Sequence, residues 1–158
     1  MFAVLLALVV TFAEGDVTVR HGGVAKSAAP GDTLQDGDEV ETGAQSRAEF
    51  AQGDGTLVRV GETSRIAVHN TSRRAFSAKL MLGDLWAKVH KLLAGDSFQI
   101  ETENGVAGVR GTEFRLEARG DEHLLRVYEG VVSLQGSGFQ HSVGAGREVR
   151  FRRDRSLR

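Results

Sequence analysis

The side chains that most often carry chemistry in proteins are spread thinly along this sequence. The histidines lie far apart, at His21, His69, His90, His123 and His141. They form neither a His-x-His pair nor a His-Glu-x-x-His motif, so the local spacing typical of metal ligands is missing. The chain has no cysteine, which excludes disulfides, thiol nucleophiles and cysteine-ligated zinc. We therefore expect no metal and no cofactor.

Sequence motifs for catalysis are also missing. Neither Gly-x-Ser-x-Gly nor a phosphate-cradling glycine motif occurs. Most carboxylates stand next to glycine or alternate with Lys and Arg along strand-like segments, as on a solvated face. A triad or carboxylate pair assembled from distant strands stays open as an alternative. The sequence predicts a protein that is not an enzyme.

Length and charge narrow the class of protein further. The chain has 158 residues, which predicts one domain. Its 20 Lys and Arg against 21 Asp and Glu give a net charge of −1, which argues against nucleic acid as a partner. Hydrophobic residues make up 41% and charged residues 26%, as in ordinary globular proteins.

The elements expected to position any site are short β-strands. The chain holds 20 glycines but one proline, a composition typical of strands joined by tight turns. Apolar and other residues alternate in many segments, which indicates half-buried strands. These segments are 16–20, 56–60, 64–69, 78–82, 97–102, 112–117, 124–128 and 131–134. Residues 82–93 come closest to helical spacing, but Gly-Asp dipeptides bracket them, which fits a strand pair equally well.

Seven Gly-Asp dipeptides punctuate these strands. They begin at Gly15, Gly31, Gly37, Gly53, Gly83, Gly95 and Gly120. Their spacing is irregular, which excludes the fixed nonapeptide period of a calcium-binding β-roll and leaves turns entering strands. Asn104-Gly105, between two apolar strands, predicts a hairpin. We expect an all-β fold, either elongated and β-solenoid-like or a two-sheet sandwich.

The N-terminal residues 1–13 are uncharged and mostly apolar, and Glu14 opens a polar sequence. Such a run is typical of a secretory signal that is cleaved near Ala13, although no basic residue precedes it. The alternative is a buried strand or helix, because the run is too short to span a bilayer as a helix. We expect export, and therefore a periplasmic or secreted protein without a transmembrane helix.

The segment from Leu80 onward resembles a known family. It contains Val109-Arg110-Gly111-Thr112-Glu113-Phe114 and then Val127-Tyr128-Glu129-Gly130-Val131. Upstream, Gly15-Asp16-Val17, Gly31-Asp32-Thr33-Leu34, Gly37-Asp38-Glu39-Val40, Thr42-Gly43 and Asp54-Gly55-Thr56 fit the same pattern. The order of these motifs resembles the FecR domain family, the periplasmic part of regulators of ferric-citrate uptake. The resemblance extends over residues 14–149.

The resemblance implies a role in signal sensing across the cell envelope. Membrane-bound members carry a cytoplasmic segment that controls a sigma factor, one transmembrane helix, this domain, and a lobe that meets an outer-membrane transporter. The first two parts are not seen in this sequence. It therefore suggests a free-standing extracytoplasmic module that binds or scaffolds an envelope protein without chemistry. The alternative is a structural or glycan-binding envelope protein, and the oligomeric state is not predicted.

The core motif has two interpretations. Val109 and Phe114 are expected to point inward, Gly111 to permit a bulge, and Thr112 to bond the turn backbone. Arg110 is expected to be held by Glu129, which stands next to Gly130 in the second segment, so that the motif clamps two strands in register. The alternative makes Arg110 the anchor for an anionic ligand.

A basic stretch closes the sequence. Residues 147–158 hold six arginines against two acidic residues, and residues 150–158 are expected to form a tail beyond the domain. Its candidate contacts to an anionic partner are Arg150, Arg152, Arg153 and Arg155. The simpler interpretation is a solvated terminus that follows a last strand at Glu148 to Phe151.

Overall fold

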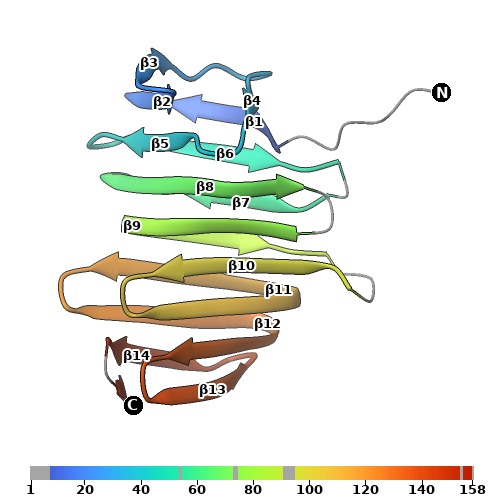
Figure 1. Ribbon diagram of the computed structural model, residues 1–158, viewed down its shortest axis with the longest axis vertical. Helices are drawn as coiled ribbons and strands as arrows, with labels where there is room; N and C mark the ends of the chain where they lie inside the picture. Colours follow the sequence, from blue (N-terminus) through green and yellow to red (C-terminus); the bar gives the residue numbers. More distant parts are fainter. Residues whose placement is uncertain (1–7, 54, 73–74, 91–94, 154, 158) are drawn as a thin grey trace.

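The described chain is built from strands alone. The computed structural model describes residues 8–53, 55–72, 75–90, 95–153 and 155–157, and none of these residues lies in a helix (Figure 1). The predicted all-β class is therefore confirmed. No helix in this part of the chain is long and apolar enough to cross a membrane.

Fifteen strands are formed by the described residues. They are β1 (Leu8–Glu14), β2 (Val17–His21), β3 (Val24–Ser27), β4 (Thr33–Leu34), β5 (Glu39–Thr42), β6 (Arg47–Ala51), β7 (Leu57–Val60), β8 (Ser64–Ser72), β9 (Ala75–Lys88), β10 (Ser97–Thr102), β11 (Gly105–Arg119), β12 (Glu122–Gly136), β13 (Phe139–Gly144), β14 (Glu148–Arg152) and β15 (Arg155–Leu157).

The strands pair in two ladders. Ladder A runs β3–β2–β5–β8–β9–β10–β11–β12–β13, and ladder B runs β4–β1–β6–β7–β9–β11–β12–β14–β15. The long strands β9, β11 and β12 belong to both ladders. For example, β9 pairs with β8 and β10 before Gly83, and with β7 and β11 from Gly83 onward. The two ladders are thus parts of one open sheet.

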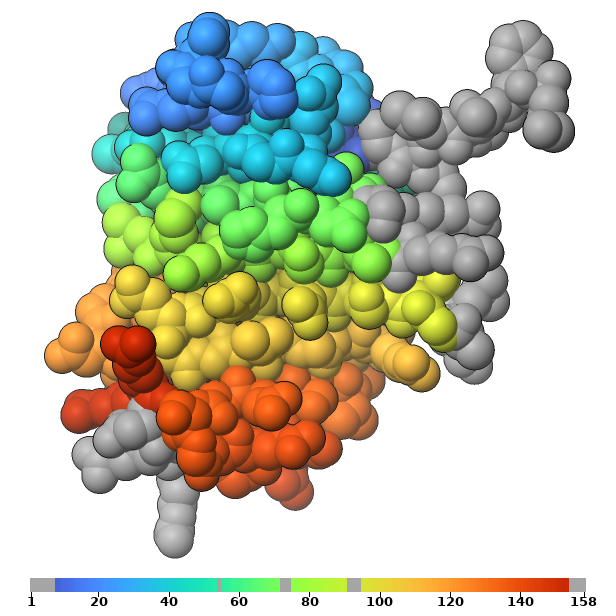
Figure 2. All heavy atoms as spheres, viewed as in Figure 1, coloured from blue at the N-terminus to red at the C-terminus, as the bar shows by residue number. Residues whose placement is uncertain are grey.

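The two ladders face each other across one core. Side chains alternate along the strands, and the buried apolar residues of both ladders form a single cluster. Among its largest fully buried members are Phe50, Leu85, Phe114, Leu125 and Phe151. The structure is therefore one open sheet that folds into two layers around a common core, with strands that continue from one layer to the other. Figure 2 shows the chain stacked along the long axis in sequence order from blue to orange, whereas the red C-terminal residues lie above the orange ones in this view.

The predicted turns are mostly found where expected, with two shifts. Strands β10 and β11 form the predicted hairpin, but Thr102 pairs with Gly105, so the turn residues are Glu103 and Asn104. Gly83-Asp84 is not a turn entering a strand. It is a corner within β9, where the strand passes from ladder A to ladder B. Residues 82–88 are therefore strand, and residues 91–94 of the ambiguous segment lie outside the described residues.

Both expected boundaries fall within strands. Strand β1 begins at Leu8, inside the run expected to be a signal, and Leu8 and Val10 are buried against β6 and β4. Residues 8–13 thus form the buried strand given above as the alternative to a signal. At the other end, β14 crosses the boundary between residues 149 and 150 and buries Phe151 completely. The fold thus continues into the expected tail.

The buried His123 makes the stability of the fold depend on pH. This residue is 5% exposed, and its ring meets the Phe151 ring edge-on at 5.7 Å. Burial lowers the pKa of His123 below its ordinary 6.5, although the charge of Glu103 opposes this effect. Below pH 6.5 the unfolded chain binds the proton first, so stability is lost as the pH falls.

We expect the urea midpoint of unfolding to fall between about pH 7 and pH 5, and His123→Gln to flatten part of this fall. The exposed His69 supplies a control for the loss of an imidazole, since His69→Gln should leave the urea midpoint at neutral pH unchanged. Equal slopes for His123→Gln and the parent protein would show that His123 is not the group responsible.

Candidate functional site

The core motif lies where β11 and β12 cross from one ladder to the other. Val109 and Phe114 are 4% and 0% exposed, so both point inward as predicted. Arg110 pairs with Val131 and Glu113 pairs with Glu129, which leaves Gly111 and Thr112 opposite Gly130 alone. The predicted bulge at Gly111 is therefore present.

Gly130 is the tightest point of this bulge. It has a φ of 76°, and a Cβ at this position would lie 2.7 Å from the Gly111 oxygen and 2.7 Å from Thr112 Cγ2. Thr112 is buried, and its hydroxyl has no hydrogen-bond partner among the described residues, contrary to the expected bond to the turn. The backbone oxygen of Thr112 instead accepts a 2.8 Å bond from Val89 N–H.

The predicted clamp between Arg110 and Glu129 is wrong. Both residues are exposed, and no ion pair or hydrogen bond joins them in the described part of the chain. The register places Glu129 opposite Glu113, on the far side of the bulge from Arg110. The bend that carries β11 and β12 between ladders separates the two side chains.

A different arginine makes the contact that was expected of Arg110. Arg115 donates two hydrogen bonds to Asp84, of 2.8 and 2.6 Å, and lies 3.1 Å from Glu117. The bonds to Asp84 raise the pKa of Arg115 above its already high ordinary value. Since Asp84 follows the corner of β9, this pair ties β11 to β9.

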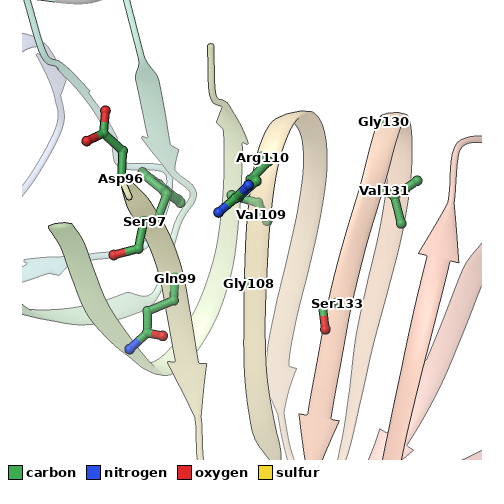
Figure 3. A pocket seen from close by; sticks show the side chains of 10 residues that line it. Asp96, Ser97, Gln99, Gly108, Val109, Arg110, Gly130, Val131 and Ser133 are labelled. Atoms are coloured by element: carbon green, nitrogen blue, oxygen red, sulfur yellow. The ribbon is translucent and has the colours of Figure 1, made fainter. Parts of the chain in front are cut away.

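Beside Arg110 the outer face of ladder A is hollowed. The pocket has a volume of about 590 Å³. Its lining residues are Asp96, Ser97, Phe98, Gln99, Gly108, Val109, Arg110, Gly130, Val131 and Ser133 (Figure 3). Gln99 and Ser133 flank Gly108 across the ladder, and a Cβ on Gly108 would meet only the Ser133 oxygen, at 3.9 Å. The missing side chain of Gly108 thus creates the hollow.

The pocket combines one cation, one carboxylate, polar side chains and an apolar wall. Arg110 extends from β11 over the space toward β10, where Ser97 and Gln99 present polar side chains (Figure 3). Its planar guanidinium offers five donors, and none is used within the described residues. Val131, 54% exposed, adds an apolar wall. The described residues include no cluster of three His, Asp or Glu able to hold a metal ion.

The arginines of the expected tail differ in how far they are neutralised. Arg150 lies 3.6 Å from Glu122 and 3.9 Å from Glu148, and Arg152 lies 3.8 Å from Glu122. Arg153 is exposed, without an acidic partner among the residues described. Arg155 begins β15, and its side chain lies outside the description. Two of the four predicted anion contacts are therefore already paired.

Because Arg110 has no partner in the described fold, we expect Arg110→Ala to change the free energy of unfolding by less than about 0.5 kcal/mol. Urea unfolding of both proteins measures this difference. As a matched comparison, Arg115→Ala should cost about 1.5–3 kcal/mol, because it removes hydrogen bonds to a charged, half-buried Asp84. A large loss from Arg110→Ala would restore the clamp.

Comparisons with known proteins agree with the motif. A sequence model of the FecR protein family matches residues 38–133. Two crystal structures of a candidate anti-sigma factor from Parabacteroides distasonis, at 2.50 and 1.65 Å resolution, share the fold. Each has a TM-score of 0.66 at 14% sequence identity, with 75% of this chain covered. The match spans 57% of that protein's chain. No curated protein matches the sequence.

Proposed function

The chain belongs to the FecR protein family, and we propose that it is a binding module that takes part in signal sensing outside the cytoplasm, without catalysis of its own. The family match supports a regulatory role, and the solved neighbours support the fold. The partner proposed here is a protein of the cell envelope.

The single observation that carries this proposal is the state of Arg110. It stands in the centre of the family motif, yet it is exposed and makes no bond within the described fold. Other outer-face arginines, such as Arg115 and Arg126, are held by acidic neighbours. An unpaired arginine beside a hollow has donors available for an external acceptor, so recognition explains the residue better than stability does.

The lining of the pocket favours binding over chemistry. It holds one carboxylate, Asp96, and two serines, and it holds no histidine. A serine nucleophile needs an adjacent base, which these lining residues do not supply. Hydrogen bonding by Arg110, Ser97 and Gln99 is the chemistry that remains.

Site-specific photo-crosslinking in envelope extract tests the proposal. A photoreactive residue in place of Gln99 should capture an envelope protein, such as a transporter or a sensor, and Arg110→Ala in the same protein should abolish the adduct. The same residue in place of Arg59, exposed on ladder B, is the control and should capture nothing comparable. Capture of peptidoglycan would favour a glycan-binding role, and equal capture from both faces would overturn the proposed site.

The N-terminal residue of the purified protein tests whether the protein is exported. Cleavage after Ala13 removes all of β1 except Glu14, so an exported protein must fold without that strand. We expect N-terminal sequencing of protein made in a Gram-negative host to find Glu14, or a residue close to it, first. An intact Met1 on protein from the cytoplasm would contradict export.

A further inference from the structure

The last strand of ladder A has one free edge. Strand β13 pairs with β12 on one side, and no described strand lies on its other side. It forms the surface at the C-terminal end of the stacked ladders (Figures 1 and 2). Its backbone is therefore available for pairing with another chain.

The free edge carries regularly spaced hydrogen-bonding groups. Strands β12 and β13 join in a hairpin with a two-residue turn, in which Gly136 pairs with Phe139. Pairs in an antiparallel ladder alternate between bonded and non-bonded, and the pair that closes such a turn is bonded. Gln140 and Ser142 consequently direct their N–H and C=O groups away from β12.

The edge of β13 lacks the features that usually protect sheet edges. Such edges are typically short, or carry charged residues or proline. Strand β4 has two residues, β3 carries Lys26, and β15 has three residues that include Arg155. By contrast, β13 has six residues, Phe139–Gly144, with no proline, lysine or arginine.

Two arginines mark the ends of this edge. Arg147 follows the turn after β13, with its N–H bonded to the Gly144 oxygen at 3.2 Å. Arg153 lines a hollow with Gly136 and Ser137, at the turn before β13. Both side chains are exposed, and neither has an acidic partner among the described residues. A segment laid along β13 would meet Arg147 at one end and Arg153 at the other, where Glu103 lines the same hollow as Arg153.

From this juxtaposition we propose that β13 binds an extended acidic segment of a partner protein, which adds to ladder A as a further antiparallel or parallel strand. Backbone bonds to Gln140 and Ser142 give affinity, and Arg147 and Arg153 select acidic residues about 20 Å apart, the length of about six extended residues. The edge is separate from the Arg110 pocket, so this inference does not depend on the proposed function.

Binding of two designed peptides to the full chain tests the inference. The first is a labelled eight-residue peptide of alternating Val and Thr with Glu at both ends, and the second has Lys in place of Glu. Fluorescence anisotropy should show at least tenfold tighter binding of the Glu peptide, with affinity falling as salt is added. Hydrogen exchange should slow at the amides of Gln140 and Ser142.

Substitutions distinguish peptide binding at the β13 edge from peptide binding at other surfaces. Ser142→Pro removes one edge N–H and should weaken binding at least tenfold, whereas Ser142→Ala should not. The double variant Arg147→Ala and Arg153→Ala should reduce the preference for Glu even if Ser142→Pro fails to fold. Arg110→Ala should leave peptide binding unchanged and affect only the crosslink at Gln99. Equal binding of both peptides, protection at β3 instead, or dimerisation of the chain through β13 would overturn the proposal.

Discussion

Phe114→Ala is expected to lower the free energy of unfolding by about 3–5 kcal/mol, the usual cost of removing a buried phenylalanine. Phe114 is completely buried. It pairs with Ala87 of β9 and Val127 of β12, both also fully buried, so its ring fills the core beneath ladder B. Because Ala87 is small, the neighbouring strands have little side-chain volume with which to fill the cavity that Phe114→Ala leaves. Urea unfolding at neutral pH measures the loss.

The control for Phe114→Ala is a substitution of an exposed apolar residue in the same pair of strands. Val131 is 54% exposed, so Val131→Ala should change stability by less than about 0.5 kcal/mol. Similar small effects from both substitutions would mean that Phe114 does not occupy the core. That result would also undermine the inward direction assigned to the whole motif.

The fold class followed from the sequence because alternation depends on local information. A residue with apolar neighbours two positions away on either side has a definite inward face, whatever strand pairs with it. Every alternating segment predicted from the sequence overlaps a strand of the structure. For residues 8–13 composition alone does not separate a signal from a buried strand, because an uncharged apolar run has the same composition in either role.

The partner of Arg110 did not follow from the sequence, because it depends on register. Alternation places Arg110 on an outer face, but the bulge at Gly111 and Thr112 decides which residue stands opposite it. The bulge brings Glu129 opposite Glu113 instead. The ion pair between Arg115 and Asp84 was missed for the same reason, since their pairing depends on the corner within β9.

The corner at Gly83 in β9 predicts the second large loss of stability. We expect Gly83→Ala to cost about 2–6 kcal/mol, by combining backbone strain with overpacking, each worth about 1–3 kcal/mol. Gly83 has a φ of 107°, and a Cβ there would overlap Ser64 Oγ and lie 2.5 Å from Ser64 Cα. Ser64 is fixed, because its Oγ accepts a bond from Asp84 N–H and donates one to the Glu62 oxygen.

Two further variants separate the causes of the Gly83→Ala loss. Gly31 has a similar φ of 94°, and a Cβ added there would have no neighbour within 4 Å, so Gly31→Ala should show the backbone strain alone, about 1–3 kcal/mol. Adding Ser64→Ala to Gly83→Ala should not restore stability, because the backbone of Ser64 still blocks the methyl group. Urea unfolding of the three variants measures these differences. If Gly83→Ala cost no more than Gly31→Ala, β9 would not pass through this tight corner, and the two ladders would not share it.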